Sequence, residues 1–186
     1  MKRIGVIVAS CLGLVVGEGA SSAQQIAGTL GAELTLTRAC VVNGSPTTVG
    51  VNFGLLDFGT EPATFVGVLT AQANTSGSAT QVLCSADVTA LNVNVGTGLN
   101  AGQGAGVGDG PRALRLGATA SYVPYEVYST AGFAAPFPTN GTGVSVSISP
   151  VGVPFALPIY GRINKTSPVA LVAGQYVDTL TVTVEF

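Results

Sequence analysis

Histidine and tryptophan are absent from this 186-residue sequence, and only 9% of its residues are charged. Without histidine the chain cannot form a Ser–His–Asp or Cys–His catalytic group, nor the usual histidine-containing zinc sites. The G-x-S-x-G motif of a strained nucleophile turn is absent as well. We therefore expect no enzymatic activity, no metal site, no cofactor and no small-molecule substrate.

Long apolar runs are also absent after the first residues. Lys2 and Arg3 precede the apolar stretch 4–16, and Ser21-Ser22-Ala23 places small residues where a signal peptidase requires them. The apolar stretch is too short to span a bilayer comfortably. We expect residues 1–23 to be a cleaved signal peptide, which leaves about 163 residues, enough for one domain.

Cysteine is scarce, and Cys11 would leave with the signal peptide. The exported chain would keep Cys40 and Cys84, an even pair in an oxidising compartment, so we expect one structural disulfide. Neither cysteine lies in a C-x-x-C pair, which disfavours a redox or metal role. In the chain-entropy model, closing this loop stabilises the fold by about 4 kcal/mol.

The few charges that remain are mostly acidic. Removal of residues 1–23 leaves five basic and eight acidic residues, a net charge near −3. A weakly acidic chain of this kind is not expected to bind nucleic acid. So low a charge content is typical of a protein whose surface is largely covered by copies of itself.

Short alternating apolar runs recur between clusters of Gly, Pro, Asn and Ser, and no run has the periodicity of a capped helix. This pattern predicts an all-β sandwich or barrel. Residues 91–95 are a clear example, with Leu91, Val93 and Val95 separated by two asparagines. The other predicted strands lie at 41–42, 51–58, 66–73, 80–84, 113–116, 125–128, 144–148, 155–159 and 176–186.

The first of these patterns lies at 26–36. Apolar residues or glycine occupy every even position and mostly small or polar residues the odd ones, which predicts an amphipathic strand. The even positions are Ile26, Gly28, Leu30, Ala32, Leu34 and Leu36.

The acidic residues are isolated in the sequence and mostly near turns, so we expect solvated side chains there rather than a catalytic pair. They are Asp57, Glu61, Asp87, Asp109, Glu126 and Asp178. The glycine-rich segment 96–110 lacks the Lys-Ser/Thr of a phosphate-binding loop, and we expect a flexible surface loop. Tyr122, Tyr125 and Tyr128 suggest a ligand platform or, as we favour, packing within or between β-domains.

Several phrases in a fixed order resemble the spore coat protein U domain, and especially the major pilin subunits of archaic chaperone–usher pili. They are Cys40 with the following Val-x-Asn-Gly, Phe53 to Gly59, Cys84, Arg112 to Arg115, Tyr125 to Tyr128, Pro158 to Gly161 and Gly174 to Phe186. The resemblance covers essentially the whole exported chain.

The resemblance implies an incomplete immunoglobulin-like β-sandwich that lacks its last strand and is completed by a donor strand from a neighbouring subunit. Residues 24–37 would be the donor extension, inserting the six even positions of 26–36, and residues 38–186 would be the pilin domain. The acceptor edge would include Tyr176, Leu180, Val182, Val184 and Phe186. The donor's end, between Glu33 and Arg38, is left open.

The function implied is that of a structural pilus subunit, exported through the periplasm to the cell surface, that serves adhesion and biofilm formation. Its partners would be copies of itself, a periplasmic chaperone, an outer-membrane usher and a tip adhesin. The alternative is a secreted spore-coat or surface-layer protein with the same domain that forms no fibre. A tip adhesin is disfavoured, because a second, ligand-binding domain does not fit in this length.

Overall fold

The computed structural model describes residues 24–186, and the predicted signal peptide lies outside them. The chain divides into two units, residues 1–35 and residues 36–186. In residues 24–39 no strand is formed and every side chain is exposed. The segment 26–36, predicted as a strand, pairs with no strand among the described residues 24–186, and an extended segment needs a hydrogen-bonded partner to become a strand.

Residues 40–186 form fourteen strands, and no helix occurs anywhere in 24–186, so the all-β prediction is confirmed. Within this described range there is accordingly no helix that could cross a membrane. The strands are β1 (Cys40–Val42), β2 (Leu55–Leu56), β3 (Gly67–Thr75), β4 (Ser78–Ala79), β5 (Gln81–Cys84), β6 (Ala90–Val95), β7 (Gly108–Asp109), β8 (Arg112–Leu116), β9 (Tyr122–Tyr128), β10 (Val144–Ser147), β11 (Phe155–Ala156), β12 (Tyr160–Lys165), β13 (Tyr176–Val177) and β14 (Val182–Glu185).

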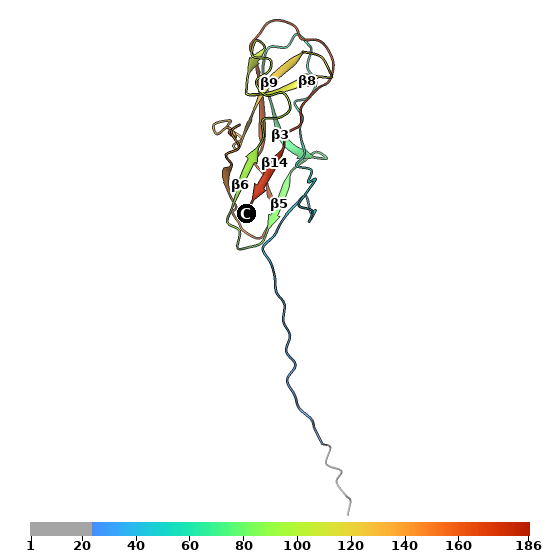
Figure 1. The fold of residues 1–186 in the computed structure, drawn as a ribbon, viewed down its shortest axis with the longest axis vertical. Helices are drawn as coiled ribbons and strands as arrows, with labels where there is room; N and C mark the ends of the chain where they lie inside the picture. The colour runs from blue at the N-terminus through green and yellow to red at the C-terminus, as the bar shows by residue number, and fades with distance from the viewer. Residues whose placement is uncertain (1–23) are drawn as a thin grey trace, which may run out of the picture. The chain divides into compact units, whose positions relative to one another are not determined.

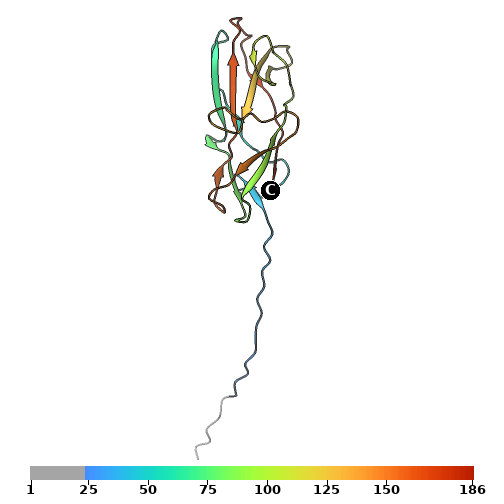
Figure 2. The ribbon, with the colours of Figure 1, turned by 90° about the vertical axis from the view of Figure 1, so that its left-hand side faces the viewer.

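The strands pair antiparallel in three sheets (Figures 1 and 2). One has the order β1-β5-β11 and another the order β10-β6-β14. The largest has the order β13-β8-β9-β12-β3-β2, with β4 added beside β3 and β7 beside β12. Figure 1 shows β14 lying along β6, as their register from Val182 opposite Val95 to Glu185 opposite Asn92 requires.

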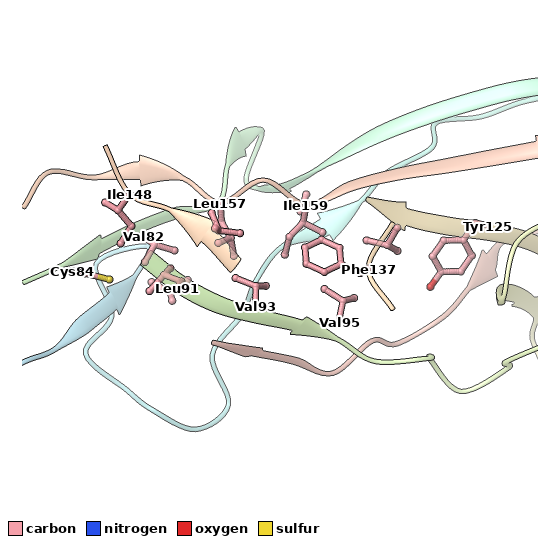
Figure 3. Close-up of a cluster of buried hydrophobic side chains, with 14 of the residues drawn as sticks. Val82, Cys84, Leu91, Val93, Val95, Tyr125, Phe137, Ile148, Leu157 and Ile159 are labelled. Atoms are coloured by element: carbon pink, nitrogen blue, oxygen red, sulfur yellow. The ribbon is translucent and has the colours of Figure 1, made fainter. Parts of the chain in front are cut away.

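Alternation in β6 builds the centre of the core. Leu91, Val93 and Val95 are buried, whereas Ala90 and Asn92 are exposed and Asn94 is half-buried. Figure 3 shows these three aliphatic side chains facing Leu157 and Ile159 across the interior. The segment 155–159 had been predicted as one alternating strand, but only Phe155–Ala156 is paired as one, although Leu157 and Ile159 are buried as expected.

The predicted disulfide between Cys40 and Cys84 is confirmed. The two cysteines are direct partners in the β1–β5 ladder. Beside the bridge, Ser85 N donates to the Ala39 carbonyl at 2.9 Å, and Ala39 N donates to Ser85 Oγ at 2.9 Å. The chain is therefore fastened at residues 39–40 by one covalent bond and a pair of hydrogen bonds.

The run 176–186 is not one strand, as the sequence pattern had predicted. Tyr176–Val177 pairs with β8, and Val182–Glu185 pairs with β6 in another sheet. Asp178, between them, accepts hydrogen bonds from Leu99 N (2.9 Å) and from the side chain of Asn100 (3.3 Å). These hydrogen bonds hold the connection between β13 and β14 against residues 99–100.

Candidate functional site

The three sheets described in residues 24–186 end on six edge strands, and two of these edges, β14 and β2, border the same cavity. Strand β14 has β6 on one side and no strand on the other, and β2 has β3 on one side and no strand on the other. An unpaired edge presents free backbone N–H and C=O groups to an incoming strand. Both edges contribute residues to the same cavity.

This cavity is an open groove of about 1030 Å³ within residues 51–182. Residues 51–63 form one wall, which contains β2, and residues 171–180 with Val182 form the other. The floor is made of core side chains from the strands between them: Leu69, Ala73, Val95, Leu114, Val123, Tyr125, Ile159 and Ile163. We call this feature the apolar groove.

In the first wall the alternation of inward and outward side chains is interrupted once, so that two pairs of apolar residues face the groove. Val51 and Phe53 are half-buried, as are Leu56 and Phe58, whereas Leu55 is 64% exposed. The shift occurs at Gly54, whose φ of +94° is open to glycine and strained for other residues. A Cβ at Gly54 would also lie 2.4 Å from the Asn74 carbonyl oxygen, so glycine is required there.

The wall is seated on another glycine. A Cβ at Gly161 in β12 would lie 2.7 Å from Phe58 Cζ and 3.1 Å from Leu56 Cδ1. The Phe58 ring therefore occupies the space that a side chain at position 161 would need. The same ring meets Tyr125 edge to face, with centroids 6.0 Å apart.

The second wall contains most of the predicted acceptor residues. Tyr176, Leu180 and Val182 are half-buried and line the apolar groove. Val184 is half-buried on the same face of β14, next to the core, but is not part of the groove lining. Phe186 is 50% exposed and lies outside the lining. The structure thus brings three of the five predicted residues together in the groove.

A polar pair lies at the floor of this otherwise apolar surface. Tyr125 Oη donates to Asp178 Oδ2 at 2.9 Å, and Tyr125 is only 2% exposed. Burial, with the negative charge and hydrogen bond of Asp178, raises the pKa of Tyr125 well above its ordinary value. The hydroxyl therefore stays protonated and ties residue 178 to the core.

Behind the groove, the Arg112 side chain is fully buried and holds the end of β6. Its guanidinium donates to the carbonyls of Val95 (2.8 Å), Gly96 (2.8 Å) and Phe137 (3.2 Å), and it pairs with Glu126. Burial lowers the pKa of Arg112, and the Glu126 carboxylate opposes that shift. Removing one partner from such a buried pair typically costs 3–5 kcal/mol, so the arrangement fixes the backbone that carries β14.

Lys165 is 1% exposed and contacts residues next to both walls of the groove. Its ammonium donates to the carbonyls of Ser167 and Val169 and lies 5.5 Å from the Phe65 ring centroid. Ser167 and Val169 lead into the second wall, and Phe65 lies in the groove lining just beyond the first. Leu171 N also donates to the Ala63 carbonyl at 2.8 Å, which joins the two walls at this end.

The expectation that Glu126 and Asp178 are solvated was wrong, because these carboxylates hold Arg112 and Tyr125. The segment 96–110 is a loop through residue 107, as predicted, but Gly108–Asp109 forms β7, which pairs with β12. Tyr125 packs in the core, as favoured, rather than forming an exposed platform.

The predicted donor residues are exposed within their own unit. Ile26, Leu30 and Leu34 are 98%, 97% and 80% exposed, and Leu36, at the start of the second unit, is 83% exposed. Gly28 and Ala32, between them, are exposed too. The apolar side chains of this row are thus exposed to water.

The sequence reasoning missed the first wall of the groove, although it had noted the phrase Phe53 to Gly59. The signal was present: two apolar pairs, each with a spacing of two, are separated by a glycine. In residues 24–186 no three His, Cys, Asp or Glu side chains gather as metal ligands. The arrangement can bind an extended apolar segment.

No curated protein matches this sequence. Among solved structures, it is similar to a chain in the crystal structure of the CsuC–CsuE chaperone–tip adhesion subunit pre-assembly complex from archaic chaperone–usher Csu pili of Acinetobacter baumannii. That likeness has 21% identity and a TM-score of 0.46, and it covers 82% of this chain but only 40% of the other. The model of the Spore Coat Protein U domain matches residues 26–183. The chain belongs to the Spore Coat Protein U domain family.

Proposed function

We propose that this protein is a structural, non-catalytic subunit of a chaperone–usher pilus. In this proposal residues 24–37 of one copy insert into the apolar groove of the next, and residues 38–186 form the domain that receives a strand. The observation that carries the proposal is an apolar groove between two unpaired sheet edges, in a chain that also has an exposed amphipathic segment.

The dimensions and chemistry of the two parts support this pairing. Residues 26–36 span about 36 Å when fully extended, which is long enough for a strand that pairs along a sheet edge. The groove floor is apolar, and the even positions of 26–36 are apolar or glycine. A strand between β2 and β14 would satisfy the free backbone groups of both edges.

The energy available is adequate for a durable joint. Ile26, Leu30, Leu34 and Leu36 are almost fully exposed. Burying each would contribute about 1.5–3 kcal/mol, before the entropy of ordering the strand is subtracted. Each added main-chain hydrogen bond would contribute about 1 kcal/mol.

The same groove accounts for the other proposed partners. Until a neighbour arrives, an open apolar surface of this kind would promote aggregation. A periplasmic chaperone that lends a strand would cover it, and an outer-membrane usher would exchange that strand for residues 24–37 of the next subunit. The fibre would lie on the cell surface, where it would be joined to a tip adhesin. There it would serve adhesion and biofilm formation.

The donor role is tested by charge substitution in the amphipathic segment. Leu30→Glu or Leu34→Glu would place a carboxylate against the apolar floor, and burial of an unpaired charge is strongly unfavourable. We expect exported, chaperone-bound monomer to accumulate and fibres to disappear in electron micrographs and size-exclusion profiles.

The matched control is Thr35→Glu, which adds the same charge on the other face of the segment and should leave fibres intact. Normal fibres from both leucine variants would contradict the donor assignment. A wild-type chain that stays monomeric, with residues 24–37 folded into its own groove, would contradict the pilus role and favour a non-fibrous surface protein.

A further inference from the structure

The position of the disulfide suggests a mechanical role, which rests on the proposed function. If residues 24–37 are held by a neighbouring subunit, any pull along the fibre enters this domain at Arg38 and Ala39. The force leaves through β14, which would hold the next subunit's strand. The path between these two places determines which part of the domain is strained.

Without the bridge, the entry point would be weak. Strand β1 has three residues and runs antiparallel to β5, with Cys40 opposite Cys84 and Val42 opposite Val82. A pull on Cys40 away from Cys84 acts at one end of this ladder, so its hydrogen bonds would break one after another. A load along the strands, in contrast, must break many bonds together.

The segment behind β1 includes a wall of the apolar groove. All of residues 51–63 lie between the two cysteines in the sequence, as do Phe65, Leu69 and Ala73 of the lining. The attachment of this wall at β2 is slight, since β2 pairs with β3 through two residues only. Once β1 was peeled away, tension would pull next on the wall that holds the neighbour's strand.

The bridge sends the force along a shorter route. Cys84 is followed by a tight turn in which Val88 N donates to the Ser85 carbonyl at 3.0 Å, and Val88 is buried. The turn leads directly into β6, and β6 carries β14 through the register from Val182 to Glu185. The disulfide thus connects the entry point to the acceptor edge without passing through residues 41–83.

We infer that the Cys40–Cys84 disulfide carries tension directly from the donor extension to the β6–β14 ladder, a route that we call the bypass. Because the tension does not pass through residues 41–83, the groove wall at 51–63 stays unstrained. Ser85 and Ala39, hydrogen-bonded beside the bridge, and the exposed Arg38–Asp87 ion pair (2.9 Å) steady the entry point but are too weak to replace it.

The experiment is to stretch single wild-type fibres in an optical trap before and after treatment with a phosphine reductant, with bridge opening verified by thiol counting. Reduced fibres should break at a lower force than oxidised ones. Before breaking they should lengthen in steps of about 150 Å per opened subunit, since the chain between two cysteines with a sequence separation of 44 is released. Oxidised fibres should show no such steps.

The control is an oxidised fibre of Val127→Ala, a core truncation in β9, which pairs with β8 and β12 and not with a strand of this path. It should lower the melting temperature yet keep the high breaking force. An unchanged breaking force after reduction would overturn the bypass alone. Reduced fibres that fall apart without load would overturn it too, because the bridge would then hold the resting fold. If the wild type forms no fibres, the proposed function fails first and the bypass with it.

Discussion

Glu126 and Asp178 differ from the other carboxylates because each has a buried partner far away in the sequence. Glu126 is paired with Arg112 and Asp178 accepts the Tyr125 hydroxyl, at separations of 14 and 53 residues. In a sequence, an acidic residue near a turn is interpreted as a solvated side chain unless the buried group that pairs with it is known. The sequence contains no local signal for either pair, so their burial could not be predicted.

The Tyr125–Asp178 pair makes stability depend on alkaline pH. Burial and Asp178 raise the folded-state pKa of Tyr125 above the unfolded value near 10. Stabilisation from a raised pKa is complete below about pH 10 and is lost as the pH rises toward the folded-state pKa, because only the unfolded tyrosine ionises. We predict that ionisation of Tyr125 in the unfolded state lowers the unfolding free energy of the wild type by about 1.4 kcal/mol between pH 8 and pH 11.

Tyr125→Phe isolates this effect, because it removes only the Tyr125 hydroxyl and leaves every other ionisable group of the chain in place. At pH 8 the variant should be less stable by about 1–3 kcal/mol, since Asp178 loses a buried donor. Urea denaturation from pH 8 to 11 should show that gap narrowing by about 1.4 kcal/mol. A constant gap would mean that Tyr125 ionises equally in both states and that the buried hydrogen bond is absent.

Among the elements, alternation predicted those strands that bury one face. Strand β6 and the half-buried face of β14 follow their sequence pattern. Strand β12 was missed because it lies between β9 and β3 and uses both faces, so Arg162 and Lys165 take covered positions. A charged residue there resembles a loop in the sequence and becomes part of a strand only through aromatic rings and carbonyls supplied by the fold.

The first wall of the groove shows the opposite case, an apolar residue that is not fully buried. Phe58 would be read as core, yet it lies half-buried at an open edge, and its place depends on the missing side chain at Gly161. Half of the candidate site was therefore visible in the sequence, namely the alternation of β14 and of 26–36. The other half, the wall at 51–63, has an apolar pattern in the sequence, but its position at the groove depends on close approaches between β12 and residues 56–58 that the pattern does not reveal.

Gly161→Ala should narrow the apolar groove without unfolding the domain. The new methyl group would displace the Phe58 ring, and because strand β12 blocks the other side, the ring has to move toward the cavity. Overpacking of this kind typically costs 1–3 kcal/mol. A synthetic peptide of residues 24–38 should bind about tenfold more weakly, measured by isothermal titration to chains whose own donor is disabled by Leu30→Glu.

Gly132→Ala is the matched control, since a Cβ at Gly132 would meet no atom within 4 Å. It should bind the peptide as the parent chain does. Equal affinity of the Gly161 and Gly132 variants would show that Phe58 does not border the bound strand.

At the scale of the whole molecule, the chain contains a row of apolar side chains and an apolar groove that are both exposed to water. In the sequence, the row precedes the fastening at residues 39–40 and all the groove residues follow it. Each copy then has one strand to give and one groove to fill, which is a head-to-tail contact. Such contacts extend into a filament unless they close into a ring.

A joint of this kind should be released only by unfolding. The inserted strand would complete the core between β2 and β14, so its loss would expose the groove floor and break two ladders at once. Unfolding across such a barrier is slow, even under conditions in which the unfolded subunit is more stable than the polymer.

We predict that fibres in SDS without boiling run as a ladder whose bands differ by the mass of one exported chain. On boiling they should collapse to a single band. Tyr125→Phe, which loosens residue 178 beside the groove, should collapse at a lower temperature than wild type. A wild-type sample that runs as a single band without boiling would mean that the subunits are joined by ordinary surface contacts instead of by an exchanged strand.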